Sequence, residues 1–211
     1  LHPEEISIDR EGRKHYMVWE YGYPGARAAK VAEFVYMAER FGLTHIVPDM
    51  RTEAAQLVSQ FHLPEKADQF GFNPLIVDQM QTRYGVDILT DSRFDVFSNN
   101  FDLYDPMVEN WRKLRGEHVT QLFREIRTAM DAINPNFKIT YRIPGDRVGS
   151  ELGNWILDWR TWVDEGLVDT LVVPVSLAAG KYYDPAERGY ISGALPLSTY
   201  RNYINASSNP D

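Results

Sequence analysis

The sequence contains no cysteine and no apolar run long enough to span a membrane. The first absence excludes disulfides and thiolate metal sites without identifying a compartment, and the second excludes a membrane-spanning helix. No glycine-rich GxGxxG or GxxxxGK[ST] turn follows any expected strand, which removes the usual signature of a nucleotide-binding sheet. No GxSxG elbow is present, so the sequence does not support a serine hydrolase triad.

Basic residues are also fewer than acidic residues. The 211 residues include 22 Lys and Arg against 30 Asp and Glu, which gives a net charge of −8. Because nucleic-acid binding depends on basic side chains that neutralise phosphates, this balance argues against a nucleic-acid partner. The start of the chain lacks both a signal peptide and an initiator Met, so we interpret it as a processed or excised piece, and a secreted or periplasmic location stays open.

The region from Pro106 to Val175 carries the clearest structural pattern. It begins with a helix whose apolar residues recur every three or four positions and which ends at Asn134-Pro135. The stripe comprises Met107, Trp111, Leu114, Leu122, Phe123, Ile126, Met130 and Ile133, with residues such as Lys113, Arg115 and Arg124 assigned to the other faces. A strand at 137–143, a Trp-rich helix at 152–166 and an apolar strand at 169–175 follow, and we expect both faces of the last strand to be buried.

The rest of the chain alternates in the same way. We expect strands at 15–19 and 44–49, separated by a helix that begins at Pro24 and ends at Gly42. A second helix begins at Asn73-Pro74 and runs to Tyr84, with Gly85 closing it, and a short helix is expected at 196–204. The long, irregular connection at 51–72 is of a length that is usually functional or disordered.

Strands that alternate with helices predict a parallel α/β fold. With four expected strands, the chain is either part of a (β/α)₈ TIM barrel with long loops or a small open sheet. We favour a single barrel-type domain over residues 1–211, an incomplete piece of a longer barrel. Because an incomplete barrel exposes sheet edges and apolar surface, we also expect it to form a homo-oligomer.

Ionisable residues cluster where the expected strands end, which is where α/β enzymes hold their sites. Asp49 is the leading candidate catalytic carboxylate, with Arg51 keeping it ionised, although a structural ion pair between the two stays open. A second carboxylate would come from Glu20, Glu53 or Asp146, since glycoside hydrolysis needs two. The candidate substrate-binding residues are Arg51, Arg142, Trp19, Tyr21, Tyr23 and His62. The aromatic ones are included because sugars present apolar faces. In contrast, Trp155, Trp159 and Trp162 are expected in the core.

No metal site or cofactor is predicted. His45, Asp49, Glu53 and His62 carry suitable ligand atoms, but their spacing matches no compact ligand motif such as HExxH. A metal-dependent barrel hydrolase or isomerase is kept as an alternative.

Several segments together carry a family resemblance: Gln69–Asn73, Ile76-Val77, Arg83–Asp87, Trp111–Gly116, Asp158–Trp162 and Glu165–Asp169. Between about Trp19 and Val173 the chain resembles the glycosyl-hydrolase-like TIM-barrel proteins of bacteria, which are similar in fold to glycoside hydrolase family 10. The resemblance implies a (β/α)₈ barrel and a carbohydrate substrate, with Asp49 as the strand-end carboxylate and Arg51 as the arginine that follows it. It leaves two hypotheses open, a hydrolase and a non-catalytic carbohydrate-binding barrel.

Overall fold

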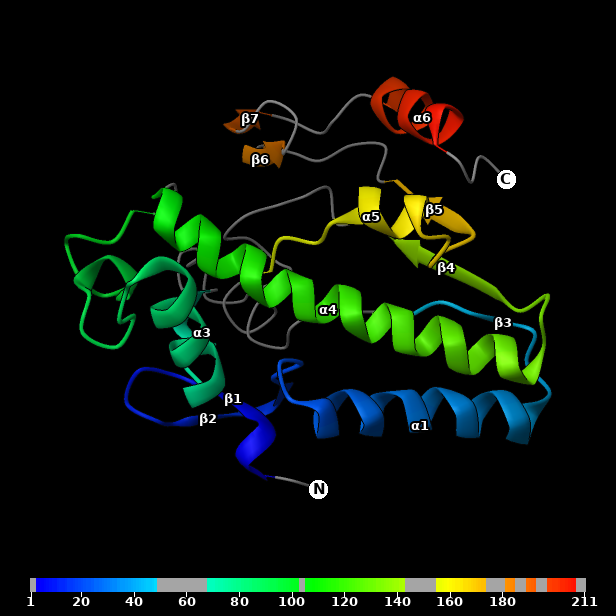
Figure 1. Ribbon diagram of the computed structural model, residues 1–211, viewed down its shortest axis with the longest axis horizontal. Coiled ribbons are helices and arrows are strands. Elements are labelled where there is room, and N and C mark those ends of the chain that lie inside the picture. The colour runs from blue at the N-terminus through cyan, green and yellow to red at the C-terminus, as the bar shows by residue number, and fades with distance from the viewer. Residues whose placement is uncertain are drawn as a thin grey trace. The chain divides into compact units, whose positions relative to one another are not determined.

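The structure is a computed structural model that describes residues 3–48, 68–102, 105–142, 155–173, 181–184, 189–192 and 197–207. Its elements alternate between helices and short strands, as Figure 1 shows, and confirm an α/β fold. The chain forms two compact units. The first comprises residues 1–27, 51–118 and 148–156, and the second comprises 28–50, 119–147 and 157–211.

The first unit begins with a 3₁₀ turn, Pro3–Glu5, and the antiparallel pair β1 (Ile6–Ile8) and β2 (Lys14–Trp19). The strand expected at 15–19 is therefore present, but the expectation that it belongs to the parallel sheet is wrong. The reason is the short connection before it, in which the N–H of Gly12 donates to the carbonyl of Asp9. A tight turn joins antiparallel neighbours, whereas parallel neighbours need a crossover of a dozen residues or more.

Helix α3 (Pro74–Tyr84) has the predicted bounds. Gly85 ends it in the left-handed conformation at φ 68°, where its N–H donates to the carbonyl of Gln81. The expected side-chain cap from Asn73 is absent. Its amide instead bonds to the backbone of β1, accepting from the N–H of Ile8 at 3.1 Å and donating to the carbonyl of Ile6 at 2.8 Å. Asn73 therefore ties the start of α3 to β1.

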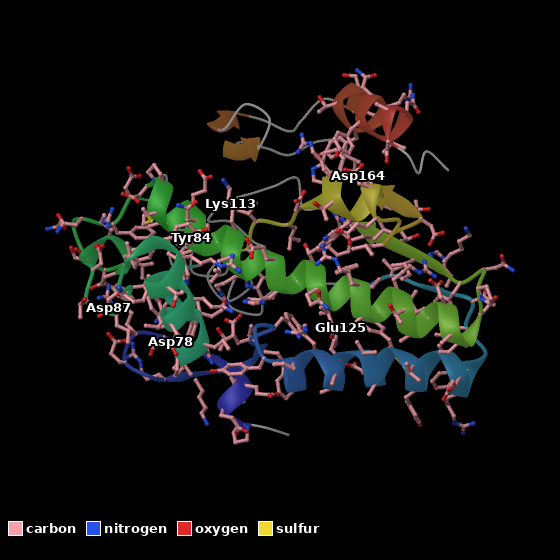
Figure 2. The ribbon with its side chains drawn as sticks, in the orientation of Figure 1. Asp78, Tyr84, Asp87, Lys113, Glu125 and Asp164 are labelled. Carbon is pink, nitrogen blue, oxygen red and sulfur yellow. The ribbon has the colours of Figure 1, made fainter. Side chains whose placement is uncertain are left out.

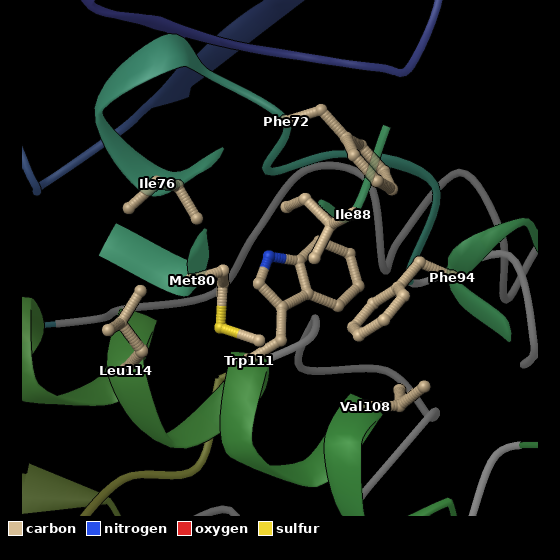
Figure 3. Close-up of a cluster of buried hydrophobic side chains, with 8 residues drawn as sticks. All are labelled: Phe72, Ile76, Met80, Ile88, Phe94, Val108, Trp111 and Leu114. Atoms are coloured by element: carbon tan, nitrogen blue, oxygen red, sulfur yellow. The ribbon is translucent and has the colours of Figure 1, made fainter. Parts of the chain in front are cut away.

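The core of the first unit lies between α3, a 3₁₀ turn at Ser92–Phe94 and the first half of α4 (Pro106–Ile133). Figure 3 shows Trp111 at the centre of this cluster, with Phe72 and Phe94 beside its ring. The indole N–H of Trp111 donates to the carbonyl of Gly71 at 3.2 Å, so the buried ring has no unsatisfied donor. The buried members are Phe72, Ile76, Met80, Ile88, Phe94, Val108, Trp111 and Leu114.

Helix α4 has the predicted bounds, and the side chain of Asp105 accepts from the N–H of Met107 at its start. Its apolar stripe is buried from Trp111 to Met130. The assignment of Arg115 to a polar face is wrong, because Arg112 and Arg115 are both fully buried. Arg115 stands four residues after Trp111 and so falls on the same side of the helix.

Helix α1 (Pro24–Phe41) runs from the first unit into the second and is followed by Gly42, as predicted. Its apolar residues are only partly buried. Phe34 and Ala38 are in the core, but Phe41 is 68% exposed. Val31 and Val35 are half-buried and line an open groove of about 560 Å³ on the second unit.

The second unit contains a three-stranded parallel sheet in the order β3 (His45–Ile46), β4 (Lys138–Arg142), β5 (Thr170–Val172). The predicted parallel connection between the last two strands is confirmed. All three strands are shorter than predicted, and β5 is not buried on both faces, because Val172 is 45% exposed. The described strands form this sheet and two antiparallel pairs, without a complete barrel.

Three further elements complete the second unit. Helix α5 (Trp159–Asp164) is shorter than predicted because Asp158 caps it, its carboxylate accepting from the N–H and hydroxyl of Thr161. Strands β6 (Lys181–Asp184) and β7 (Gly189–Ser192) form an antiparallel pair that the sequence did not predict. Helix α6 (Leu197–Ala206) confirms the short helix expected at 196–204. Trp159 packs on Tyr200 and Tyr203 of α6, and Trp159 and Trp162 are core residues as expected.

Candidate functional site

The C-terminal ends of β3, β4 and β5 lie at one edge of the parallel sheet. The register pairs His45 with Lys138 and Ile46 with Ile139, and β5 pairs with β4 through Arg142 and Val172. In parallel α/β proteins this edge is where ligands bind. In the sequence, Asp49 comes three residues after the end of β3 and Asp146 four residues after the end of β4, and both lie outside the described residues.

Side chains alternate between the two faces of the sheet. One face is closed by aromatic packing within the second unit. Phe123 stacks on Trp162 with ring centroids 4.1 Å apart, and both rings meet Tyr141 of β4 edge-on. The indole N–H of Trp162 donates to the hydroxyl of Thr120, which fixes the orientation of the ring. This face forms a rigid support for the centre strand.

The opposite face carries polar and exposed side chains. His45 and Thr140 are joined across the strands at 2.8 Å between Nε2 and Oγ1. Towards the C-terminal edge the same face presents Val47, Arg142 and Val172, all of them exposed. Arg142 is the one charged residue among the described strand ends at this edge. This exposed face contrasts with the usual parallel sheet, in which both faces are covered.

The opposite end of the sheet is held by Asp169. Its carboxylate accepts from the N–H of Ile139 and from Lys138, both at 2.8 Å, and from Arg127 at 3.0 Å. Burial acts to raise the pKa of Asp169, but these hydrogen bonds and the two cationic charges outweigh burial and hold the pKa below its ordinary value. Asp169 therefore stays ionised and fixes β5 against β4 and α4.

Glu20, a predicted catalytic carboxylate, lies in the first unit and is 1% exposed. Its Oε2 accepts from Nη2 and Nε of Arg115 at 2.9 and 3.1 Å. Arg115 also donates to the carbonyl of Phe70 and lies over the ring of Trp155. A carboxylate enclosed in this way lacks the access to substrate that an acid catalyst needs.

The aromatic candidates near Glu20 are covered to different degrees. Tyr21 is buried edge-on against Trp155, with centroids 5.7 Å apart. Trp19 and Tyr23 are half-buried. Burial raises the pKa of Tyr23, partly offset by hydrogen bonds from Leu75 and Asn73. None of these residues belongs to the parallel sheet.

A second buried ion pair stands one helical turn from the first. Arg112 pairs with Asp68 through two hydrogen bonds, one of them 2.9 Å from Nε to Oδ1, and both side chains are fully buried. Sequence analysis missed both ion pairs. The available signal was the spacing of Arg115 from Trp111, which places a charged residue on the apolar stripe.

Two glycines allow close approaches around Arg115, one to its side chain and one to the backbone of Ile156. Gly71 has φ 113°, and any Cβ there would overlap the guanidinium of Arg115. A Cβ on Gly116 would overlap the carbonyl of Ile156. The segment Trp111–Gly116, which carries part of the family resemblance, thus has its residues fixed mainly by packing in the first unit.

Five of the predicted site residues lie outside the described residues: Asp49, Arg51, Glu53, His62 and Asp146. Within the described ranges, no group of three His, Asp or Glu side chains is arranged to hold a metal ion. None of the described helices is long and apolar enough to cross a membrane.

Comparison with known proteins leaves the family resemblance as a hypothesis. No protein-family model matches the chain, and no curated protein matches its sequence. The expected homo-oligomer and the single-domain organisation likewise stay predictions.

Proposed function

We propose that this chain is a glycoside hydrolase-like domain of the (β/α) barrel type, with Asp49 and Asp146 as its pair of carboxylates. The observation that carries the proposal is the parallel pairing of β3 and β4. Asp49 comes three residues after Ile46, and Asp146 comes four residues after Arg142. Adjacent parallel strands end at one edge, which favours a shared site for the two residues.

The environment of Glu20 supports the choice of Asp146 over it. Glu20 belongs to the antiparallel β1–β2 part of the first unit, and its carboxylate is committed to Arg115. Glu53 follows the same strand as Asp49, so it would not bring a carboxylate from a second strand. Asp146 follows the centre strand of the sheet and satisfies that requirement.

In this proposal the two carboxyl groups divide the chemistry between them. One donates a proton to the glycosidic oxygen as the bond breaks, and the other attacks the anomeric carbon or activates a water. Arg51 keeps Asp49 ionised, because a nearby cation lowers a carboxyl pKa. A separation of about 5–5.5 Å between the carboxyl groups would give retention, and about 6.5–9.5 Å would give inversion.

The test is hydrolysis of a panel of neutral and acidic oligosaccharides by the wild-type chain and by Asp49→Asn and Asp146→Asn, followed as released reducing ends. Each substitution is expected to lower turnover by roughly 10²- to 10⁴-fold, because each removes an acid–base group. The matched control is Asp78→Asn, on the exposed side of α3 (Figure 2), which should keep full activity. Circular dichroism checks that every variant folds.

Unchanged turnover in both variants would remove the assignment of these carboxylates. The second candidate is a non-catalytic carbohydrate-binding domain. The pairing of Glu20 with Arg115 favours it, because that pair takes one of the predicted acids out of reach. Glycan binding without release of reducing ends would support this candidate over the hydrolase.

A further inference from the structure

The guanidinium of Arg142 differs from those of most described arginines in its surroundings. A carboxylate partner is present for Arg13, Arg83, Arg93, Arg112, Arg115, Arg124 and Arg127. Arg142 is exposed, and no described carboxylate lies within ion-pairing distance of it. It stands at the end of the centre strand, on the face opposite the aromatic packing of Phe123 and Trp162 on Tyr141.

The described neighbours of Arg142 at this edge are apolar. Val172 is its partner residue on β5, and the end of β3 continues into Val47 and Pro48. Val47 and Val172 are 58% and 45% exposed, so the edge offers apolar surface beside a single cation. Sugars present both an apolar face and polar groups. A sugar that also carried an anion would match both parts of this surface.

Arginine is suited to binding an anionic sugar because its planar guanidinium can donate two parallel hydrogen bonds to a carboxylate or sulfate. The chain as a whole carries a net charge of −8, and two of its aspartates belong to the proposed site. An anionic ligand would be repelled there unless a cation offset the charge. Among the described strand ends at this edge, Arg142 is the cation that can do so.

We propose that the strand-end surface binds a glycan that bears an oxyanion, either a uronic acid carboxylate or a sulfate ester, and that Arg142 donates to that group. This inference rests on the proposed function only in that the ligand is a glycan. It does not require that the glycan be hydrolysed. His45, exposed and farther from the edge on the same face, offers its Nδ1 to a sugar hydroxyl, while its Nε2 bonds to the buried hydroxyl of Thr140.

Isothermal titration calorimetry with sulfur-linked oligosaccharides, which resist hydrolysis, tests the proposal. The probes are an oligogalacturonide, the same oligosaccharide with its carboxyl groups reduced to alcohols, and a sulfated galacto-oligosaccharide. The wild-type chain should bind at least one anionic probe about 10- to 100-fold more tightly than the neutral one, as expected for a charge-assisted hydrogen bond. Comparing the two anionic probes identifies the oxyanion.

The decisive variants are Arg142→Gln and Arg142→Lys, with Arg40→Gln as the matched control. Arg40 is an exposed arginine in the last turn of α1, before the N-terminal end of β3, whereas Arg142 stands at the C-terminal end of β4. Arg142→Gln should abolish the preference for the anionic probe and leave affinity for the neutral probe unchanged. Arg142→Lys should retain part of the preference, and Arg40→Gln all of it.

Several results would overturn the inference: equal affinity for all probes, no binding of any probe, or an Arg142→Gln variant that behaves like Arg40→Gln. Loss of binding of both the neutral and the anionic probes in Arg142→Gln would also overturn it, because Arg142 would then be needed for the structure of the protein and not for contact with the anion. Preference for an anionic probe, together with no hydrolysis of the oligosaccharide panel used to test the proposed function, would leave this inference standing and remove the hydrolase. Hydrolysis without that preference would do the reverse.

Discussion

The buried pair of Glu20 and Arg115 provides a quantitative test of the first unit. Both side chains are 1% exposed, and Glu20 accepts two hydrogen bonds from the guanidinium. Glu20→Gln keeps the shape of the side chain but removes its charge, while Arg115 cannot lose its proton. Removing one partner of a buried ion pair leaves an uncompensated charge, which costs about 3–5 kcal/mol of unfolding free energy. Because Gln can still accept one hydrogen bond, we expect about 3 kcal/mol.

The assay is urea unfolding monitored by far-ultraviolet circular dichroism. The free energies of unfolding of the variants are compared with one common value for their dependence on urea concentration. The control is Glu165→Gln, whose partner Arg124 is 40% exposed, and which should cost about 1 kcal/mol or less. In the double variant Glu20→Gln/Arg115→Met, the combined cost should fall short of the sum by on the order of 2 kcal/mol, since neither charge is left alone.

If Glu20→Gln costs no more than Glu165→Gln, the two charges do not depend on each other. Glu20 would then return as a candidate acid, and the choice of Asp146 would lose its main support. A large cost with no coupling in the double variant would instead assign the effect to packing around the Trp111 and Trp155 rings, over which Arg115 lies.

Two further predictions concern close contacts in the two units. In an exposed helix, Gly116→Ala would raise the free energy of unfolding by about 1 kcal/mol. Here the new Cβ meets the carbonyl of Ile156, so we expect urea unfolding to show a loss of about 1–3 kcal/mol. A gain in stability would refute the close approach. The hydrogen bond to Asp164, with a contribution from burial, raises the pKa of Tyr203 to about 12. The unfolded value is about 10, so this stabilisation is complete below pH 10 and is lost as the pH rises towards 12. Absorbance titration of tyrosinate should lose its highest-pH component in Tyr203→Phe and keep it in Tyr36→Phe, whose side chain is 63% exposed.

The helices were predictable because their signals are local. Pro74 and Gly85 bracket α3, and Pro106 and Asn134 bracket α4, as periodicity and end residues indicated. Proline is tolerated in the first turn of a helix but not in its interior, because it lacks the N–H that an interior position must donate. Glycine adopts the left-handed conformation that ends a helix. The α/β alternation followed from these boundaries. Strand lengths did not, since they depend on neighbours elsewhere in the chain.

The interactions that the sequence did not reveal join distant residues. Arg115 meets Glu20 across 95 positions, and Asn73 serves β1 rather than the helix that it precedes. Val172 lies on an exposed face, although its apolar run indicates a buried strand. Periodicity reports how one element is oriented but does not identify its partner, which explains each of these misses.

The position of one candidate residue was predictable, whereas its role stays a prediction. The rule that parallel strands carry ligands at their C-terminal ends selected Arg142, and the parallel register of β4 with β5 pairs it with Val172 at the end of both strands. The same rule also selected Glu20, but the strand that precedes it, β2, pairs antiparallel with β1 outside the parallel sheet, so the rule does not apply there. Whether a strand is parallel depends on its pairing, which single-sequence patterns do not specify.

The connections made by Asp169 have a consequence for the order in which the chain folds. Its partners on α4 and β4, Arg127 and Ile139, lie 42 and 30 positions away, whereas Glu20 and Arg115 are separated by 95. Shorter loops cost less entropy to close, so α4, β4 and β5 can form a nucleus before the N-terminal strands join. In hydrogen exchange, the amide of Ile139 should therefore acquire protection early in refolding, ahead of the amide of Ile8 in β1, whose acceptor Asn73 lies 65 positions away.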